Sequence, residues 1–314
     1  MKHSDGAVIS SGQRPGASNR FRRLRDISGS YAFLLPNIVG FLIFTFGPVV
    51  ASVLLSFCQW DLISGLKGIS WVGLANYREL SGDPLFRQYT YNTLYLMLVI
   101  PFAMAGSLIL AIMLNQKLTG TTFFRTVFYL PSMCVPVAVF LVWLTLFNTD
   151  IGLINKGLGA VGISGPHWLQ DPAWAKPALM IAGLWMGIGG GNMILYLAGL
   201  QGVPRELYEA ADIDGASGLQ KFFAITWPFL TPTTFFIFIM SLIGGLQGNF
   251  EGPFMMTKGG PAGSTTTISY YIFSNAFDYF RMGYAAAIAC VLFAFVLVVT
   301  LINWKLIEGK VGYH

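Results

Sequence analysis

The chain has 314 residues, of which 54% are hydrophobic and only 11% are charged, and its formal net charge is +5. Soluble domains carry about 25% charged residues, so this composition excludes an ordinary globular enzyme or binding domain. The positive charge does not indicate a nucleic-acid partner, because most basic residues lie where membrane topology places them. The composition therefore predicts an all-α membrane protein that spans the lipid bilayer several times.

The N-terminal residues 1–30 form a basic, polar tail that we expect to be flexible on the cytoplasmic side. This tail lacks the short apolar core of a cleavable signal peptide. The three cysteines, Cys58, Cys134 and Cys290, lie in apolar sequence without metal-ligand spacing. Their odd number predicts buried thiols and no disulfide framework.

Six stretches without Asp, Glu, Lys or Arg follow the tail and define a transmembrane domain over residues 31–314. A helix needs about 20 apolar residues to cross the hydrocarbon core, and each stretch is longer than that. Helices are predicted throughout, because the bilayer centre offers no other partners for backbone polar groups. The predicted spans are residues 31–60, 88–116, 126–149, 177–204, 222–250 and 282–304.

The distribution of lysine and arginine predicts the orientation of these spans. One side of the membrane, which includes both termini, has 12 of these residues and the other side has 7. The positive-inside rule therefore places both termini in the cytoplasm, together with the loop that joins the fourth and fifth spans.

That loop, residues 206–232, carries four acids and has a helical pattern. The spacing i, i+3, i+4, i+7 that starts at Leu207 predicts a short helix. Pro204 suits its first position and Gly215 its C-terminal stop. A second short helix is expected after the bend, and Pro228 marks the entry into the fifth span.

This loop resembles the EAA motif of ABC-importer permeases. The family usually has Leu where this chain has Trp227, an apolar replacement. The matching residues are Glu209-Ala210-Ala211, Asp214-Gly215-Ala216, Phe222 and Ile225-x-Trp227-Pro228.

The resemblance covers about residues 31–304, and its other motifs are those of the longer subunit in two-permease carbohydrate importers. This branch includes maltose-like and glycerol-phosphate-like importers. The further matches are Asn76-Tyr77, Leu130-Pro131, Gly152-x-x-Asn155, Met256-Thr257-x-Gly259-Gly260-Pro261 and Gly283-Tyr284-Ala285-Ala286.

The resemblance implies a multi-pass permease subunit of the bacterial inner membrane, in an ATP-driven importer of a carbohydrate. Its implied partners are a second EAA-motif permease in a heterodimer, two ATPase subunits and an extracytoplasmic solute-binding protein. ATP and Mg²⁺ then belong to the ATPases, and this chain is expected to have no catalytic residue, metal or cofactor of its own. The residues implied to couple the ATPase to the membrane helices are Glu206, Glu209, Ala210, Ala211, Asp214, Gly215, Ala216, Phe222 and Pro228.

Polar or small residues within the spans indicate a substrate path. Gly191 and Asn192 end a glycine run in the fourth span, which makes that helix pliable or lets another helix pack closely. The resemblance implies that Ser132 and Asn249 face the substrate cavity, and that apolar Leu246 occupies a cavity position that is usually polar. The predicted path residues are Ser132, Gly191, Asn192, Leu246, Gln247 and Asn249.

The lack of ionisable residues in the predicted spans argues against a proton- or sodium-coupled carrier and favours a neutral substrate. A glycerol-phosphate or polyol importer is an alternative, since a partner permease can supply basic groups. A polytopic membrane enzyme is a more remote alternative, because all three histidines lie outside the predicted spans.

Overall fold

The structure, a computed structural model, describes residues 34–116 and 120–308. The predicted flexible tail, residues 1–30, lies outside the described residues. The chain divides into two units, residues 1–54 and residues 55–314, and each is described by itself.

The first unit contains most of the first predicted span. Residues 34–41 are α-helical, Leu42–Phe46 form a π-helical turn (η1), and α2 is Gly47–Leu55. The helix Leu34–Leu55 is long and apolar enough to cross a membrane. It ends before the predicted boundary at residue 60, because residues 58 and 59 belong to a β-strand.

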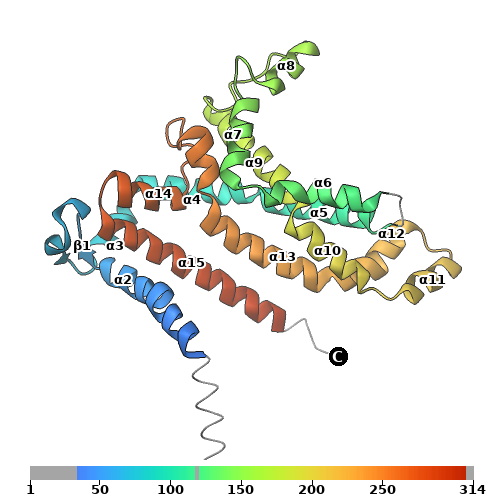
Figure 1. Cartoon of the computed structure of the whole chain (residues 1–314), viewed down its shortest axis with the longest axis horizontal. Helices are drawn as coiled ribbons and strands as arrows, with labels where there is room; N and C mark the ends of the chain where they lie inside the picture. The colour runs from blue at the N-terminus through green and yellow to red at the C-terminus, as the bar shows by residue number, and fades with distance from the viewer. Residues whose placement is uncertain (1–33, 117–119, 309–314) are drawn as a thin grey trace, which may run out of the picture. The chain divides into compact units, whose positions relative to one another are not determined.

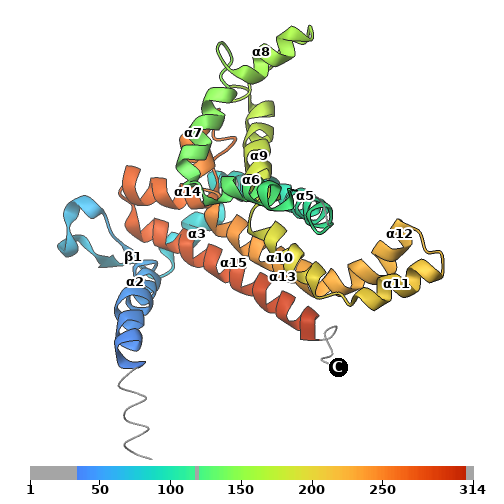
Figure 2. The same cartoon turned by 45° about the vertical axis from the view of Figure 1, so that its right-hand side comes forward.

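The second unit provides the other candidate spans, which are Pro84–Leu114, Pro172–Gln201, Gly218–Thr257, Met282–Asn303 and a bent pair of helices (Figures 1 and 2). The described residues thus contain five candidate spans, or six if the bent pair is one span, in agreement with the predicted all-helical membrane fold. The helices are α3 (Ala75–Gly82), α4 (Pro84–Met97), α5 (Val99–Leu114), α6 (Thr121–Met133), α7 (Pro136–Leu146), α8 (Leu153–Ala160), α9 (Pro172–Gly189), α10 (Gly191–Gln201), α11 (Arg205–Ile213), α12 (Gly218–Lys221), α13 (Trp227–Gly248), α14 (Ile268–Phe273) and α15 (Met282–Glu308). Short elements complete the unit: β1 (Cys58–Gln59), β2 (Ser70–Trp71), 3-10 turns at Leu62–Ser64 and Leu66–Gly68, and π-helical turns η4 (Phe222–Thr226), η5 (Pro253–Thr257) and η6 (Ser274–Asp278).

The third predicted span, residues 126–149, is not one helix as expected. It consists of α6 and α7, which meet at 96°. Cys134 and Val135 between them are extended, with ψ angles of 147° and 127°. A residue before proline avoids the helical region, so Pro136 ends α6 and starts α7.

The prediction that the cysteines are buried is wrong for one of them. Cys58 is buried and Cys290 is partly buried, but Cys134 is exposed at the bend. Within the part of the chain that the structure describes, none of the three forms a disulfide bond.

Several helices are longer than the charge-free stretches from which they were predicted. The helix α9 begins at Pro172 rather than at residue 177, because the Asp171 side chain caps it by accepting the Ala173 N–H at 2.9 Å. Lys176 therefore lies within the first turns of this span. Its ammonium nitrogen is 4.9 Å from the ring centre of Tyr91 and 5.1 Å from that of Tyr95.

The main core forms where α4, α5, α10, α13, α14 and α15 pack together. Helices α13 and α15 lie side by side, with α14 at one end and the α11–α12 loop at the other end of α13 (Figures 1 and 2). Burial is nearly complete for Tyr196 of α10, Ile237 of α13 and Ile288 of α15. A second cluster joins α9 to Phe147 and Trp168.

Side-chain amides hold the loops beside these helices. The side chain of Asn76 donates to the carbonyl oxygens of Ser56 and Cys58, at 2.9 Å each. Asn155 accepts the indole N–H of Trp168 at 2.7 Å, and the ring of Trp168 is buried. These contacts give a structural reason for two of the family motifs.

Asp83 joins three helices at the end of the unit that carries α14. Its carboxylate accepts hydrogen bonds from the hydroxyls of Tyr271 (2.6 Å) and Tyr284 (2.7 Å), and from the Leu85 N–H at 2.8 Å. Burial alone would raise the pKa of Asp83, but these hydrogen bonds lower it overall. Burial and the neighbouring carboxylate raise the pKa of Tyr271 to about 12, so its hydroxyl stays a donor.

We predict that Asp83→Asn lowers the melting temperature of the purified protein, because a hydrogen bond to a charged group contributes about 1.5–3 kcal/mol. The pKa of Asp83 is lowered on folding, so its contribution is complete above the unfolded pKa and is lost as pH falls below about 3.9. The melting temperatures of wild type and variant should therefore converge in acid. Asp150→Asn, at an exposed acid, is the control, and equal melting of all three proteins at neutral pH would contradict the prediction.

Candidate functional site

The EAA-like loop begins with α11, which has a well-defined C-terminal end. Gly215 has a φ of +71°, a left-handed conformation that glycine adopts without steric cost. The N–H of Ala216 donates to the Ala211 oxygen at 2.9 Å, and the Gly215 N–H donates to the Asp212 oxygen at 3.1 Å. This pair of bonds is a Schellman motif, which satisfies carbonyls that a helix end leaves free. It explains why small residues and glycine occupy these positions.

The second helix of the loop, α12, starts with a capping box. The Ser217 hydroxyl accepts the Gln220 N–H, and the Gln220 side chain accepts the Ser217 N–H at 2.7 Å. The chain then passes without a break through η4 into α13. Two side-chain contacts link α12 and η4 to α11. Tyr208 of α11 hydrogen-bonds to Thr226 of η4 at 2.8 Å, and Lys221 of α12 forms an ion pair with Asp212 of α11. The loop is thus a fixed helix–turn–helix at the start of α13.

Most of the predicted coupling residues lie on the open side of this loop. Only three are half-buried: Ala211, Ala216 and Phe222. The inner side of α11 is formed by Tyr208 and Ala211 rather than by the whole predicted stripe. The exposed coupling residues are Glu206, Glu209, Ala210, Asp214, Gly215 and Pro228.

Two apolar side chains on the loop were missed by the sequence argument. Ile213 is 87% exposed and Leu219 is 72% exposed, at the end of α11 and within α12. Their exposure beside acidic residues gives the loop a mixed apolar and acidic face. The signal in the sequence was a pair of large apolar residues outside the helical stripe.

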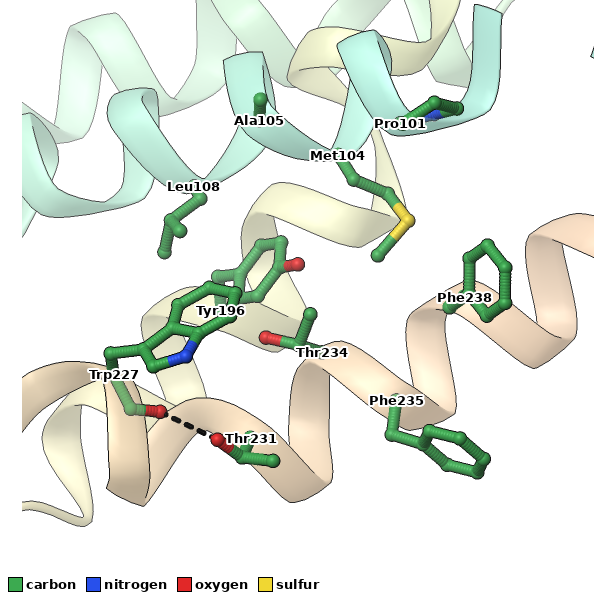
Figure 3. A pocket seen from close by; sticks show the side chains of 10 residues that line it. All are labelled: Pro101, Met104, Ala105, Leu108, Tyr196, Trp227, Thr231, Thr234, Phe235 and Phe238. Carbon is green, nitrogen blue, oxygen red and sulfur yellow. Dashed lines mark hydrogen bonds between the residues drawn. The ribbon is translucent and has the colours of Figure 1, made fainter. Parts of the chain in front are cut away.

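Trp227, at the start of α13, forms one wall of an apolar groove of about 400 Å³ between α5, α10 and α13 (Figure 3). Met104, Tyr196 and Phe238 also line it. The Thr231 hydroxyl, which also lines the groove, donates to the Trp227 oxygen at 2.9 Å. Few polar groups reach the groove, so it suits an apolar neighbour better than a sugar.

The glycine run breaks the fourth span at the place where α6 crosses it. A Cβ on Gly189 would lie 2.0 Å from the Phe128 carbonyl oxygen, and one on Gly190 would lie 3.1 Å from the Ser132 Cβ. The backbones of α9 and α6 therefore touch here, as the close-packing interpretation expects. A Cβ on Gly191 would meet nothing within 4 Å, so that position is not required for packing. The structure brings Ser132 next to the glycine run.

Asn249 lies elsewhere, at the C-terminal end of α13. Its amide donates to the Gly245 oxygen at 2.8 Å, and its backbone oxygen accepts the Thr267 hydroxyl at 2.5 Å. It lines a small cavity of about 70 Å³ whose walls come from α4, α5, α7, α9 and η5 and do not include Ser132 or Gly191.

The other predicted path residues differ in burial. Leu246 is 2% exposed within the main core, whereas Gln247 is exposed and Asn192 is half-buried. The predicted residues therefore do not form one site within this chain. Among residues 34–116 and 120–308, no group of three or more His, Cys, Asp or Glu side chains is placed to hold a metal ion.

Comparison with known proteins shows that residues 103–307 match the family model described as binding-protein-dependent transport system inner membrane component. The chain is 39% identical over 310 residues to the probable ABC transporter permease protein YesP of Bacillus subtilis (strain 168), covering 96% of this chain and 98% of that protein. It is 34% identical over 286 residues to the arabinooligosaccharides transport system permease protein AraP of the same organism, covering 88% of this chain and 87% of that protein.

A solved structure is also similar. A chain in the crystal structure of a bacterial ABC transporter that imports the acidic polysaccharide alginate matches with a TM-score of 0.83 and 25% identity. The match covers 94% of this chain and 100% of that chain. The fold described above is therefore that of a known transporter chain.

We predict that Gly189→Ala destabilises the protein by about 1–3 kcal/mol, the usual cost of overfilling a packed interior. The added methyl group would collide with the Phe128 backbone, which cannot move as a side chain can. Gly191→Ala is the matched control, and it should change stability by less than about 0.5 kcal/mol. Thermal melting of the two variants measures the difference, and equal melting would show that the crossing of α6 and α9 is not this close.

Proposed function

Because the chain belongs to the family of binding-protein-dependent transport system inner membrane components, we propose that it is a permease subunit of an ATP-driven carbohydrate importer. The chain is a transport component with several apolar membrane helices. The relatives that are named for arabinooligosaccharide and alginate transport support a carbohydrate as substrate.

The proposed complex contains a second EAA-motif permease, two ATPase subunits and an extracytoplasmic solute-binding protein. ATP and Mg²⁺ bind to the ATPase subunits and supply the energy of transport. A related alginate transporter has been crystallised with its substrate-bound periplasmic protein, which supports the last partner. This chain contributes a path and a mechanical link rather than chemical catalysis.

The observation that carries the proposal is the fixed geometry of the α11–α12 loop. An exposed face with Glu206, Glu209 and Ile213 suits a groove on an ATPase that offers basic and apolar groups. The Tyr208–Thr226 bond and the continuous η4–α13 helix connect that face to the membrane. Movement of the ATPases would therefore tilt α13 rather than deform the loop.

We infer that this loop and both termini face the cytoplasm, as the lysine and arginine count predicts. The loop of residues 251–281, at the opposite end of α13, then faces the solute-binding protein. In intact cells, an impermeant thiol reagent should reach a cysteine in residues 251–281 and not one in the α11–α12 loop.

The proposed path runs past Ser132, Gly191, Asn192, Gln247 and Asn249 and is completed by the second permease. Leu246 is buried in the core, so it packs behind the path residues and does not line the path itself. An uncharged path favours a neutral sugar, and a glycerol-phosphate or polyol is the alternative substrate. Uptake that requires an anionic or phosphorylated solute would favour that alternative.

We predict that Gly215→Val uncouples the importer. A left-handed conformation costs a residue with a side chain about 1–2 kcal/mol, so valine would distort the Schellman end of α11. The purified complex should lose ATPase subunits or sugar-dependent ATP hydrolysis. Gly215→Asn, which tolerates this conformation, and Gly218→Ala, at an uncrowded position, are the controls. Normal transport by Gly215→Val would refute the coupling role.

We predict that Asn249→Leu reduces sugar uptake while the complex still assembles, because a polar partner left unpaired costs about 1–3 kcal/mol. Asn249 also bonds to Gly245, so the alternative is that it only caps α13. Thermal melting separates the two roles. Early melting with a normal rate per assembled complex would make Asn249 structural, and Gln170→Leu, on an exposed loop, is the control.

A further inference from the structure

A polar cavity lies at the end of the spans opposite the α11–α12 loop. This cavity, here called the outer pocket, has a volume of about 420 Å³ and lies between the first turns of α4, the residues before α14, and η6. Ligand-binding pockets usually measure about 300–1,000 Å³, so the outer pocket has the size of a small-ligand site. Its walls include Tyr89, Lys258, Tyr270, Ser274, Asp278 and Tyr279.

Hydrogen bonds fix the frame of the outer pocket. The Asn92 amide donates to the oxygens of Gly263 and Thr266, at 2.9 Å each, and the Ile268 N–H donates to the Thr93 hydroxyl at 3.0 Å. The segment before α14 is therefore held against α4. On the other side, the Arg281 N–H donates to the Asn275 oxygen at 2.7 Å, which anchors the end of η6.

Two residues at or beside this cavity have unusual backbone conformations. Lys258 and Phe280 have φ angles of 50° and 57°, a region that residues other than glycine seldom adopt. Lys258 lines the pocket, and Phe280 lies between two lining residues, Tyr279 and Arg281. The π-helical turn η6 contributes further wall residues, and such turns are frequent at functional sites. Strained positions of this kind cluster at binding sites.

The groups that frame the outer pocket have hydrogen-bond partners, but several polar side chains in its wall can still bind a ligand. Among the described residues, no hydrogen bond or ion pair involves the side chains of Lys258, Tyr270, Ser274, Asp278 or Tyr279. The ammonium group donates, the carboxylate accepts, and the three hydroxyls do both. Burial first, and the nearby Asp278 and Tyr279, raise the pKa of Tyr270, which keeps this phenol a neutral donor.

This set of groups matches a carbohydrate. A sugar ring presents hydroxyls that donate and accept, together with apolar C–H faces that pack against aromatic rings. Tyr279 is 62% exposed, so its ring is open to such contact. A purely ionic ligand would need charges of one sign, but Lys258 and Asp278 carry opposite charges, and the other charged residue in the wall, Arg281, forms an ion pair with Glu79. A purely apolar ligand would leave all these polar groups unpaired.

We propose that the outer pocket binds one sugar residue of the transported carbohydrate, outside the membrane helices and before the solute enters the path. This proposal rests on the proposed function. It adds a site made of Tyr279, Asp278 and Lys258 at the entrance of this subunit. The site would hold the sugar as it leaves the solute-binding protein.

The test uses the full importer with its ATPases in proteoliposomes. The probe is whichever of lactose, arabinotriose and maltotriose the wild type takes up fastest in the presence of its solute-binding protein. Asp278→Asn and Tyr279→Ala should raise the KM for uptake about fivefold to tenfold, as expected for the loss of one good contact, with little change in maximal rate. Phe277→Ala is the matched control, because Phe277 is an exposed ring of the same turn that does not line the pocket.

A second measurement detects the sugar directly, without the solute-binding protein. In a background that lacks the three native cysteines, Ser274→Cys should react with a thiol reagent more slowly when the probe sugar is added. Phe277→Cys should react at the same rate with and without sugar. Protection of Ser274→Cys that disappears with Asp278→Asn would localise the sugar to this pocket.

The outcomes distinguish the possible failures. In one outcome, the wild type transports the sugar while Ser274→Cys shows no protection and the Asp278 and Tyr279 variants show no rise in KM. That result would refute sugar binding in the outer pocket and leave the proposed function intact. Weaker binding of the sugar-free solute-binding protein to the Asp278 and Tyr279 variants would show that the pocket receives that protein instead. If the wild type carries none of the three sugars and its uptake instead requires glycerol phosphate or another phosphorylated solute, the carbohydrate part of the proposed function fails and this proposal fails with it.

Discussion

A membrane helix cannot leave backbone polar groups without partners, and this constraint governs each break in the spans of this chain. Where α4 meets α5, the Leu98 N–H donates to the Tyr95 oxygen at 3.1 Å. At the bend after α6, the Cys134 N–H donates to the Pro131 oxygen at 3.3 Å. Near the glycine break, the Ser107 hydroxyl of α5 donates to the Gly187 oxygen of α9 at 3.1 Å. Local turns and a hydroxyl from a neighbouring helix therefore permit changes of direction inside an apolar environment.

The sequence predicted the spans and their helical nature because apolar length is a local property. It did not predict how the spans bend. Pro136 was visible in the third span, but the 96° angle depends on how α6 and α7 pack. The same holds for Gly189, where the sequence allowed either a pliable helix or a close crossing. Only the position of the Phe128 carbonyl shows that a crossing occurs there.

The C-terminal end of α11 was predictable from the local sequence, because a helix end is decided within a few positions. Ala211, Gly215 and Ala216 form the Schellman motif with bonds that span at most five residues. The Asp83 contacts were not predictable in this way, since 188 residues separate Asp83 from Tyr271 and 201 separate it from Tyr284. Nothing near Asp83 in the sequence marks it as the point where three helices meet.

Among the described residues, the charges of the candidate spans lie near the ends of the spans rather than in their middles. Lys176 keeps its ammonium group near the end of α9 by resting on the rings of Tyr91 and Tyr95, which replaces part of its hydration. Asp83 and Asp278 lie at the same end of the spans as α14. In the proposed importer, a solute would therefore meet charged and hydroxyl groups before it enters the spans. Discrimination by charge would then occur at the entrance, and the uncharged interior would select by shape and hydroxyl pattern.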